Sequence, residues 1–449
     1  MSLAPLARTF FEQLQAYKNR SPKLAYWKEL EQTQFLPREE LLAIQQQRLE
    51  KLIEFVWNRN PFYRQRMESV GLTPTDLKDV NALRRLPILT KAEVRQNTQR
   101  MISQGYELDK LHIAKTGGST GKALDLYFTE KCSEQRNACA RRHDCWSGWQ
   151  PGEPIAACWG NPKHPKTLKD KFKFHLLQPY IYLDTMHVDE AAVRTFLDQW
   201  HKVKPTLLYG HAHSIYLLAE TIKSMGTDPP TPKGVLSTSM MLIQSERKVI
   251  EEVFGIKVTD RYGCEEVSLI ASECEKHEGM HLNIEHLVIE FLREDGTPAA
   301  PGEPGRIVVT DLMNKAMPFI RYAVEDVGVP TDRMCSCGRG LPLMEQVTGR
   351  VADFLIKSDG SKVAGVSLIE NTLTAFTGID QLQIFQEELK SFVLRVVPGI
   401  GYDSQVKKQL LDYFYSVFGR QTNIVLDEVG TILPEASGKY RFSICKVIK

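Results

Sequence analysis

Apolar residues recur at helical spacing in the first part of the chain. Between residues 41 and 56 they lie near a period of 3.6 residues, and Pro61 marks the end of this pattern. Thr90, followed three residues later by Glu93, is typical of a capping box at the start of another helix. The spacing therefore predicts that residues 1–110 are mainly helical.

From about residue 111 to residue 330, short apolar runs alternate with helical stretches. The runs include PIAACWG, PTLLYG, LVIEFL and GRIVVTDL, and they are closed by Gly, Pro or Asp, while DEAAVRTFLDQWHK has helical spacing. Alternation of this kind predicts parallel strands that are buried on both faces, with helices packed against them.

The last hundred residues, which begin at Gly349, have a different order of elements. Strand-like LQIFQ and SFVLRVV precede the helical stretch SQVKKQLLDYFYSVFG, and strand-like TNIVLDEV follows it. This order is typical of a small α+β module. We therefore predict an α/β fold with a large domain over residues 1–348, which includes the helical segment, and a small domain over residues 349–449.

Length, charge and cysteine content narrow the class of protein. A chain of 449 residues is long enough for two or three domains, and 57 Lys and Arg against 55 Asp and Glu give no indication of nucleic-acid binding. There is no apolar stretch of membrane-spanning length and no secretory signal pattern, so we expect a cytoplasmic protein that does not bind a membrane. The nine cysteines, an odd number, then favour metal binding or burial over disulfides.

The stretch KTGGSTGK at residues 115–122 has the composition of a phosphate-binding loop. Glycine lets the backbone approach a polyanion, Ser and Thr add small donors, and a lysine supplies a positive charge. A flexible surface turn is the alternative interpretation. The candidate phosphate-binding residues are Thr116, Gly117, Gly118, Ser119, Thr120, Gly121 and Lys122.

This loop resembles the ATP-phosphate loop of the adenylate-forming superfamily. From about residue 40 onward the chain resembles the phenylacetate–CoA ligase branch, and especially its CapK-like (coenzyme F390 synthetase-like) members. Asp260 opens the stretch DRYGCEE, which resembles the Tyr-Gly-x-Thr-Glu motif of these enzymes. The resemblance implies that Tyr262 and Gly263 lie against adenine and that Glu266 helps to hold Mg²⁺ on ATP.

Three further motifs follow in the order found in that superfamily. RYAVED resembles the motif whose aspartate binds the ribose hydroxyls, which implies this role for Asp326. GRVAD resembles the hinge about which the small domain moves, with Arg350 contacting the nucleotide and Asp353 as the pivot. PEASGK resembles the terminal loop whose lysine enters the active site, here Lys439.

Three cysteines and a histidine form a candidate zinc site. Cys274 is followed by His277 and His281, and CSC places Cys335 and Cys337 close together. Three thiolates and one imidazole suit tetrahedral zinc, although four unrelated buried residues are the alternative. CapK-like proteins have a similar arrangement, which favours His281 over His277 and implies a structural ion.

The resemblance implies that the protein activates a carboxylic acid with ATP, releases pyrophosphate and holds the acid as acyl-AMP. Catalytic roles are expected for Lys122, Glu266 and Lys439. Transfer of the acyl group to coenzyme A is the first expectation, and an amine or a carrier protein is an alternative acceptor. A nucleotidyltransferase that adenylylates a hydroxyl group and a catalytically silent binding protein are the competing hypotheses. A homodimer is left open.

The acid itself is expected to be aromatic. Polar and aromatic residues at several strand ends are candidates for contacting it, because α/β sheets form clefts there. Aromatic residues in such places also pack in cores, so both interpretations stay open. The candidate substrate residues are Trp159, Tyr209, His211, His213 and Ser239.

Overall fold

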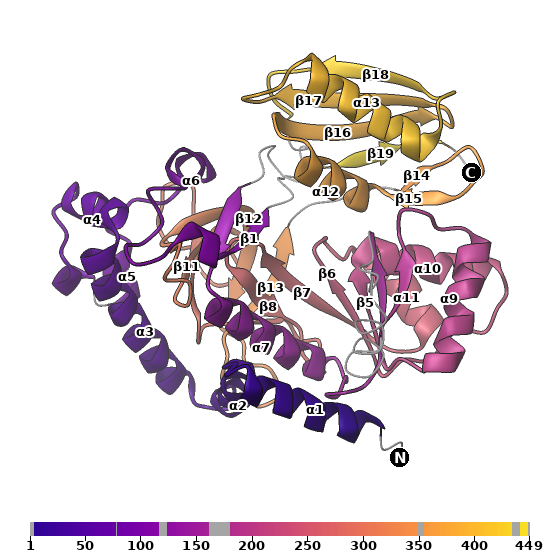
Figure 1. Ribbon diagram of the computed structural model, residues 1–449. Coiled ribbons are helices and arrows are strands. Elements are labelled where there is room, and N and C mark those ends of the chain that lie inside the picture. The colour runs from indigo at the N-terminus through magenta and orange to yellow at the C-terminus, as the bar shows by residue number, and fades with distance from the viewer. Residues whose placement is uncertain are drawn as a thin grey trace.

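The computed structural model describes residues 4–77, 79–115, 124–160, 180–348, 354–432 and 441–447. Helices dominate the first part of the chain, and they form the left and lower edges of the molecule in Figure 1. Thr90 and Glu93 form the capping box that the sequence predicts. The elements are α1 (Ala4–Lys18), α2 (Lys23–Thr33), α3 (Arg38–Arg59), α4 (Pro61–Glu68), η1 (Pro74–Asp76), α5 (Val80–Leu83), α6 (Lys91–Asn97) and η2 (Leu108–Lys110).

A sheet of eleven strands forms the centre of the molecule, in the order β10-β11-β12-β13-β9-β8-β7-β6-β5-β3-β4. From β4 to β7 the neighbouring strands are parallel, as the alternating pattern predicts. Helices connect or flank these strands. The elements are β3 (Ile155–Trp159), β4 (Tyr180–Asp184), β5 (Leu207–His211), β6 (Gly234–Thr238) and β7 (Val258–Cys264), with α7 (Glu130–Trp146), α9 (Glu190–Val203), α10 (Ala212–Ser224) and α11 (Gln244–Phe254).

The other half of the sheet is antiparallel, so the prediction of parallel strands as far as residue 330 is wrong there. LVIEFL and GRIVVTDL become adjacent antiparallel strands that are joined by residues 293–304, a segment that forms turns and contains no helix. A strand that is buried on both faces has an apolar sequence whether its neighbours are parallel or antiparallel, so the sequence does not give its direction. The strands are β8 (Ser268–Ser272), β9 (Met280–Leu282), β10 (Leu287–Leu292), β11 (Gly305–Asp311), β12 (Tyr322–Thr331) and β13 (Leu343–Thr348).

The C-terminal part has its own four-stranded sheet, in the order β18-β17-β16-β19, and lies above the larger part in Figure 1. Its core also contains Ala212 and Met240 of the larger part. The fold class therefore matches the prediction. The elements are β14 (Phe354–Ile356), β15 (Lys362–Ala364), α12 (Gly365–Ala375), β16 (Ile379–Glu388), β17 (Ser391–Pro398), α13 (Ser404–Phe418), β18 (Asn423–Glu428) and β19 (Ser443–Cys445).

Helix α1 packs against the rest of the protein through its polar side. Arg8 donates to the carbonyl of Gly152 at 3.0 Å, and Glu12 forms ion pairs with Arg141 at 2.6 Å and Lys23 at 3.1 Å. The large apolar side chains of the helix point to solvent instead. They are Leu6, Phe10, Phe11, Leu14 and Tyr17, with exposed fractions of 44–87%.

Candidate functional site

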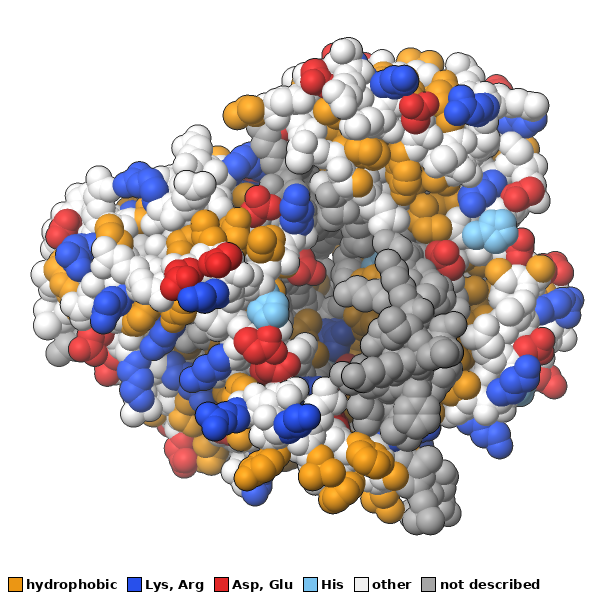
Figure 2. Space-filling view, viewed as in Figure 1, with side chains coloured by type: hydrophobic (Ala, Val, Ile, Leu, Met, Phe, Trp, Pro, Cys, Tyr) orange, Lys and Arg blue, Asp and Glu red, His pale blue; other side chains and the backbone are white. Residues whose placement is uncertain are grey.

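A cavity of about 570 Å³ opens where the parallel strands end, between the large sheet and the C-terminal part. Figure 2 shows this region as the hollow in the middle of the molecule. The sheet order reverses between β3 and β5, and ligands of open α/β sheets bind beside such a reversal. Ile369 and Phe442 bring the C-terminal part to the same cavity.

Most of the site residues predicted from sequence that the structure describes line this cavity. Lys115, the last described residue before the predicted phosphate loop, lines it as well. The strands on either side of that loop, β1 (His112–Lys115) and β2 (Asp125–Phe128), pair with each other. The predicted residues in the cavity wall are Trp159, Tyr209, Ser239, Asp260, Tyr262, Gly263, Glu266 and Asp326.

Several predicted residues lie outside the part of the chain that the structure describes. These are Thr116, Gly117, Gly118, Ser119, Thr120, Gly121 and Lys122 of the phosphate loop, Arg350 and Asp353 of the hinge, and Lys439.

Glu266 is buried beside the cavity and is held by a neighbouring tyrosine. The hydroxyl of Tyr322 donates to Glu266 Oε1 at 2.7 Å, and burial together with the Glu266 charge raises the pKa of Tyr322. Arg136 of α7 donates to the carbonyl of Glu266 at 2.9 Å and pairs with Asp311 at 3.1 Å. Both the carboxylate and the backbone of this glutamate are therefore fixed in place.

The predicted adenine and ribose contacts are joined by a hydrogen bond. Tyr262 donates its hydroxyl proton to Asp326 Oδ2 at 2.8 Å, which fixes one oxygen of the carboxylate. A β-carbon at Gly263 would lie 2.6 Å from the carbonyl oxygen of Ser268, so the pairing of β7 with β8 requires glycine there. The conformation of this motif is therefore set by the sheet itself.

Asp260 lies in the wall of the cavity with its side chain half-buried. Ser237 Oγ donates to its carboxylate at 2.8 Å. Burial, and next the charge of Glu273, raise the pKa of Asp260 to about 7. This carboxyl group therefore changes its charge near neutral pH, unlike an exposed aspartate.

Trp159 and Tyr209 form a flat wall of the cavity. Their rings are stacked with centroids 5.4 Å apart and an angle of 7° between the planes. The guanidinium of Arg261 lies 5.2 Å from the Tyr209 ring and pairs with Asp144 at 2.9 Å. The wall thus combines a planar apolar surface with a buried positive charge.

The two predicted histidines do not line the cavity. His211 is fully buried with its ring 4.0 Å from that of Trp159, and burial lowers its pKa to about 3, so it is neutral. The ring of His213 contacts the Glu246 carboxylate and stacks on Tyr216. His211 ends β5 and His213 lies in the first turn of α10, but their side chains serve packing and helix contacts.

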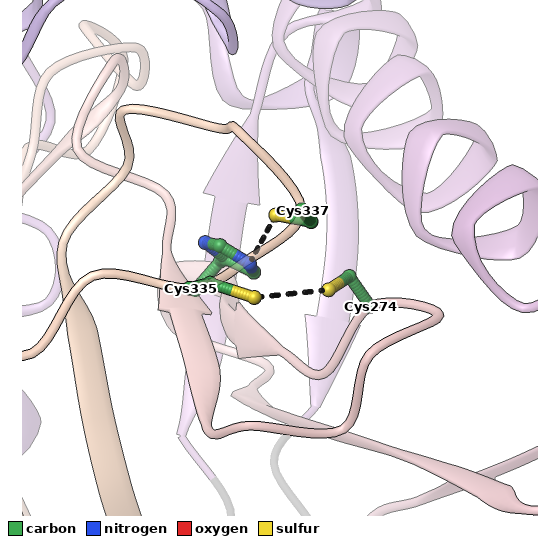
Figure 3. A group of neighbouring side chains, drawn as sticks. Cys274, Cys335 and Cys337 are labelled. Carbon is green, nitrogen blue, oxygen red and sulfur yellow. Dashed lines mark hydrogen bonds between the residues drawn. The ribbon is translucent and has the colours of Figure 1, made fainter.

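The four predicted metal ligands come together at a second place. Their ligand atoms all lie within 4.8 Å of one another, and Cys274 Sγ is 3.7 Å from Cys335 Sγ (Figure 3). Cys337 Sγ lies 3.4 Å from His281 Nε2. A tetrahedral ion with metal–sulfur bonds of about 2.3 Å needs thiolates about 3.8 Å apart, so the spacing fits zinc.

The protonation of His281 also fits a metal site. Burial and the charge of Arg339 lower the pKa of His281 to about 4, so its imidazole is neutral. Its Nδ1 lies 3.4 Å from the Leu341 carbonyl, which leaves Nε2 facing the cysteines. His277 instead contacts Glu273 at 3.2 Å, so the structure groups His281 rather than His277 with the thiols.

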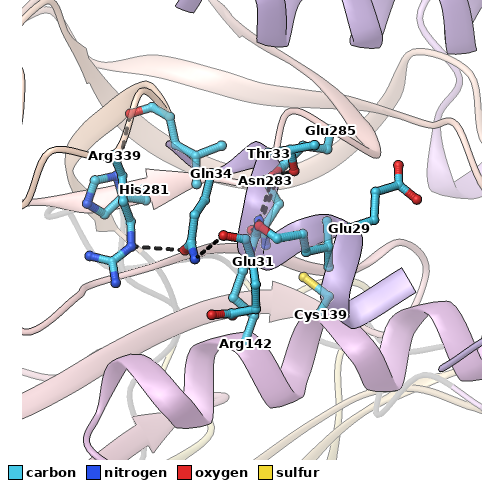
Figure 4. A network of polar contacts seen from close by, with 12 residues as sticks. Glu29, Glu31, Thr33, Gln34, Cys139, Arg142, His281, Asn283, Glu285 and Arg339 are labelled. Atoms are coloured by element: carbon cyan, nitrogen blue, oxygen red, sulfur yellow. Dashed lines mark hydrogen bonds and ion pairs between the residues drawn. The ribbon is translucent and has the colours of Figure 1, made fainter. Parts of the chain in front are cut away.

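A buried polar network supports this cluster from the side of α2 and α7 (Figure 4). Gln34 Oε1 accepts hydrogen bonds from Arg339 Nε at 3.0 Å and from Trp146 Nε1 at 2.9 Å. Arg142 donates to Asn283 at 2.7 Å and pairs with Glu285. The network links the N-terminal helices to the strands that carry the cluster.

Tyr322 and Arg136 were not predicted as functional residues. A tyrosine after an arginine at the start of an apolar strand reads as core packing, and Tyr322 is indeed buried. Arg136 stands in a helix among other charged residues. The signal for Tyr322 was its position in the same motif as Asp326.

Comparisons with known proteins agree in pointing to one group of enzymes. A family model described as the CapK C-terminal domain matches residues 355–446. The phenylacetate–coenzyme A ligase of Escherichia coli is 26% identical over 89% of this chain and 94% of its own length. That of Thermus thermophilus is 27% identical over 72% of this chain and 73% of its own length.

Solved structures show the same fold. A 2-hydroxyisobutyryl-CoA ligase in complex with 2-HIB-AMP and CoA matches 92% of each chain with a TM-score of 0.62 and 18% identity. Among the described residues, no helix is long and apolar enough to span a membrane.

Proposed function

This chain is a homologue of the phenylacetate–CoA ligases, with the fold of the adenylate-forming enzymes and a CapK C-terminal domain, and we propose that it activates a carboxylic acid with ATP. The acid's carboxylate oxygen would attack the α-phosphorus, forming acyl-AMP and releasing pyrophosphate. The thiol of coenzyme A would then displace AMP and form a thioester. The observation that carries the proposal is the meeting of Tyr262, Glu266 and Asp326 in one cavity.

Glu266 is proposed to provide an oxygen ligand for the Mg²⁺ that accompanies ATP. A hard carboxylate oxygen suits Mg²⁺, which would neutralise charge on the triphosphate. The Tyr322 hydroxyl fixes Oε1 and so orients the carboxylate before ATP arrives. Such pre-orientation lowers the cost of assembling the site around a nucleotide.

Asp326 is proposed to accept hydrogen bonds from the ribose hydroxyls. The hydrogen bond from Tyr262 holds this carboxylate in the cavity wall, where the sugar would lie. The backbone at Tyr262 and Gly263 would lie against the adenine. A segment of β7 would thus meet the adenine, while Asp326 of β12, held by Tyr262, would meet the ribose.

An aromatic acid is the proposed substrate class. The stacked rings of Trp159 and Tyr209 offer a planar surface in the cavity, against which a flat ring can pack. Ser239, which also lines the cavity, is proposed to contact the acid. His211 would act only by supporting Trp159 from behind.

The remaining roles belong to segments outside the described residues. We propose that residues 116–121 cradle the phosphates with Lys122 as a counter-charge. We also propose that Lys439 stabilises charge at the α-phosphorus, with Arg350 and Asp353 at a hinge that begins the small domain. Phe442, three residues after Lys439, lines the cavity and supports this placement.

We further propose that Cys274, His281, Cys335 and Cys337 hold one structural zinc ion. Four protein ligands complete the tetrahedral shell, so the ion would have no open position for substrate. Cys274 precedes β9 and His281 lies in it, while Cys335 and Cys337 lie in the segment between β12 and β13. Zinc would therefore brace the strand that carries Asp326.

Acid-dependent exchange of labelled pyrophosphate into ATP tests the proposed function. A panel of aromatic and aliphatic acids should include at least one that supports exchange, and addition of coenzyme A should then yield its thioester. Stable transfer of AMP to a hydroxyl compound would instead support a nucleotidyltransferase. Acyl transfer to an amine or to a carrier protein, without formation of a coenzyme A thioester, would change only the acceptor. Absence of both exchange and AMP transfer would contradict the enzyme assignment.

A further inference from the structure

A second pocket lies on the opposite side of α7 from the main cavity. Its volume is about 320 Å³, and it is bounded by α2, α3, the start of α7 and the segment after β11. Ser133 and Arg136 of α7 face the main cavity, whereas Lys131 and Gln135 face this pocket. The helix therefore separates two distinct cavities.

Three lysines from separate segments converge on this second pocket. Lys51 comes from α3, Lys131 from α7 and Lys315 from the segment after β11. Within the described residues, none of the three has a hydrogen bond or an ion pair, and the Lys315 ammonium lies 5.0 Å from the centre of the Phe55 ring. Burial, and next the charges of Lys131 and Lys51, lower the pKa of Lys315.

The other charged groups in the pocket do not balance these lysines. Glu29 is the acidic residue in the lining, and its carboxylate is already paired with Arg48. Arg48 is further engaged by the Tyr26 hydroxyl at 3.0 Å and by the Glu285 carbonyl at 2.7 Å. The pocket thus holds an excess of about three positive charges, whose mutual repulsion an anion would relieve.

We propose that this pocket binds a ligand that carries phosphate groups, with its anionic oxygens on Lys51, Lys131 and Lys315. Ammonium groups from three directions suit a multiply charged, tetrahedral anion better than a single planar carboxylate. The rings of Tyr26 and Tyr106 in the same lining provide apolar surface for the rest of the ligand. Two sources share this chemistry: the nucleotide end of coenzyme A and a separate phosphorylated regulator.

Binding of adenosine 3′,5′-bisphosphate to the full chain tests the site. Titration calorimetry is done with a non-hydrolysable ATP analogue present at saturation, so that the main cavity is occupied. The double variant Lys51→Gln/Lys131→Gln alters two exposed side chains and should fold normally. We expect it to weaken binding of the bisphosphate at least tenfold and to reduce the dependence of affinity on salt. The matched control Lys110→Gln/Lys223→Gln, which changes two exposed lysines elsewhere, should bind as the unaltered protein does.

Steady-state kinetics then distinguishes the two sources. If the ligand is coenzyme A, the double variant raises the KM for coenzyme A about tenfold and leaves acid-dependent pyrophosphate exchange unchanged. If the ligand is a regulator, bisphosphate binding is lost while that KM stays the same. Both outcomes support the site. Equal affinity for the unaltered protein and the variant, or no binding at physiological ionic strength, overturns it. The calorimetric arm compares two proteins with the same main cavity, so failure of the exchange assay would leave the comparison interpretable.

Discussion

The main cavity and the cysteine–histidine cluster both use loops and strand ends of the same sheet, but they are built in opposite ways. The cluster is compact: its four ligand atoms lie within 4.8 Å of one another, and three of the four residues are buried while Cys337 is half-buried. The cavity is open, and its wall includes Ile369 and Phe442 of the C-terminal part. A compact site contributes to stability, whereas an open site whose wall is shared by two parts depends on how those parts meet. Substitutions in the two places should therefore affect different properties.

The largest effect is expected from Lys439→Ala, which removes a charge from the proposed reaction centre. Acyl-AMP formation should fall by about 10²-fold or more, because one charge-stabilising donor is worth about that much. The melting temperature should stay the same. Rapid-quench measurement of the first half-reaction checks this, with Lys110→Ala as the control. Near-normal acyl-AMP formation would contradict the role of Lys439.

Substitutions in the cysteine–histidine cluster should instead lower the stability of the protein. Metal analysis of protein prepared without chelators should find about one zinc per chain. His281→Ala should lose the zinc and lower the melting temperature by at least about 5 °C, because the bound ion contributes to folding free energy. The neighbouring His277→Ala, whose side chain contacts Glu273, should keep it. If His281→Ala kept the zinc and His277→Ala lost it, His277 rather than His281 would be the ligand.

A smaller effect is expected for Glu266→Gln. The neutral amide is a weaker ligand for Mg²⁺, so the magnesium concentration needed for half-maximal exchange should rise about tenfold. Tyr322→Phe, which removes only the hydrogen bond to Oε1, should shift it less. Magnesium titrations of pyrophosphate exchange measure both. An unchanged requirement in Glu266→Gln would point to the adjacent Glu265.

The smallest effect concerns the pH dependence of stability. The pKa of Asp260 is raised to about 7 in the folded protein from about 3.9 in the unfolded chain. Below about pH 4 both states are protonated, so its contribution is fully present. It is lost as the pH rises toward 7, because only the unfolded state has released the proton. Asp260→Asn should flatten the fall in melting temperature between pH 4 and 7, which thermal denaturation across that range measures. An identical slope in both proteins would contradict the raised pKa.

The sequence predicts best the sites that are formed by uncommon side chains lying close together along the chain. Four thiol and imidazole side chains in two short stretches predicted a cluster, and the structure brings those four together. The direction of β10 and β11 was not accessible, since burial on both faces removes the alternation that marks an antiparallel strand. Lys51, Lys131 and Lys315 gave no signal either, because exposed lysines are common and these are separated by up to 264 residues. Their meeting depends on packing that no local pattern encodes.

The inverted packing of α1 has a consequence for how this segment is attached. An ordinary amphipathic helix is held by its apolar face, and added salt does little to loosen it. Here the attachment runs through Glu12 with Arg141 and Lys23, so dissolved ions compete with it directly. We therefore expect residues 4–18 to be attached most firmly at low ionic strength and to loosen as the salt concentration rises, while the apolar core beneath stays intact.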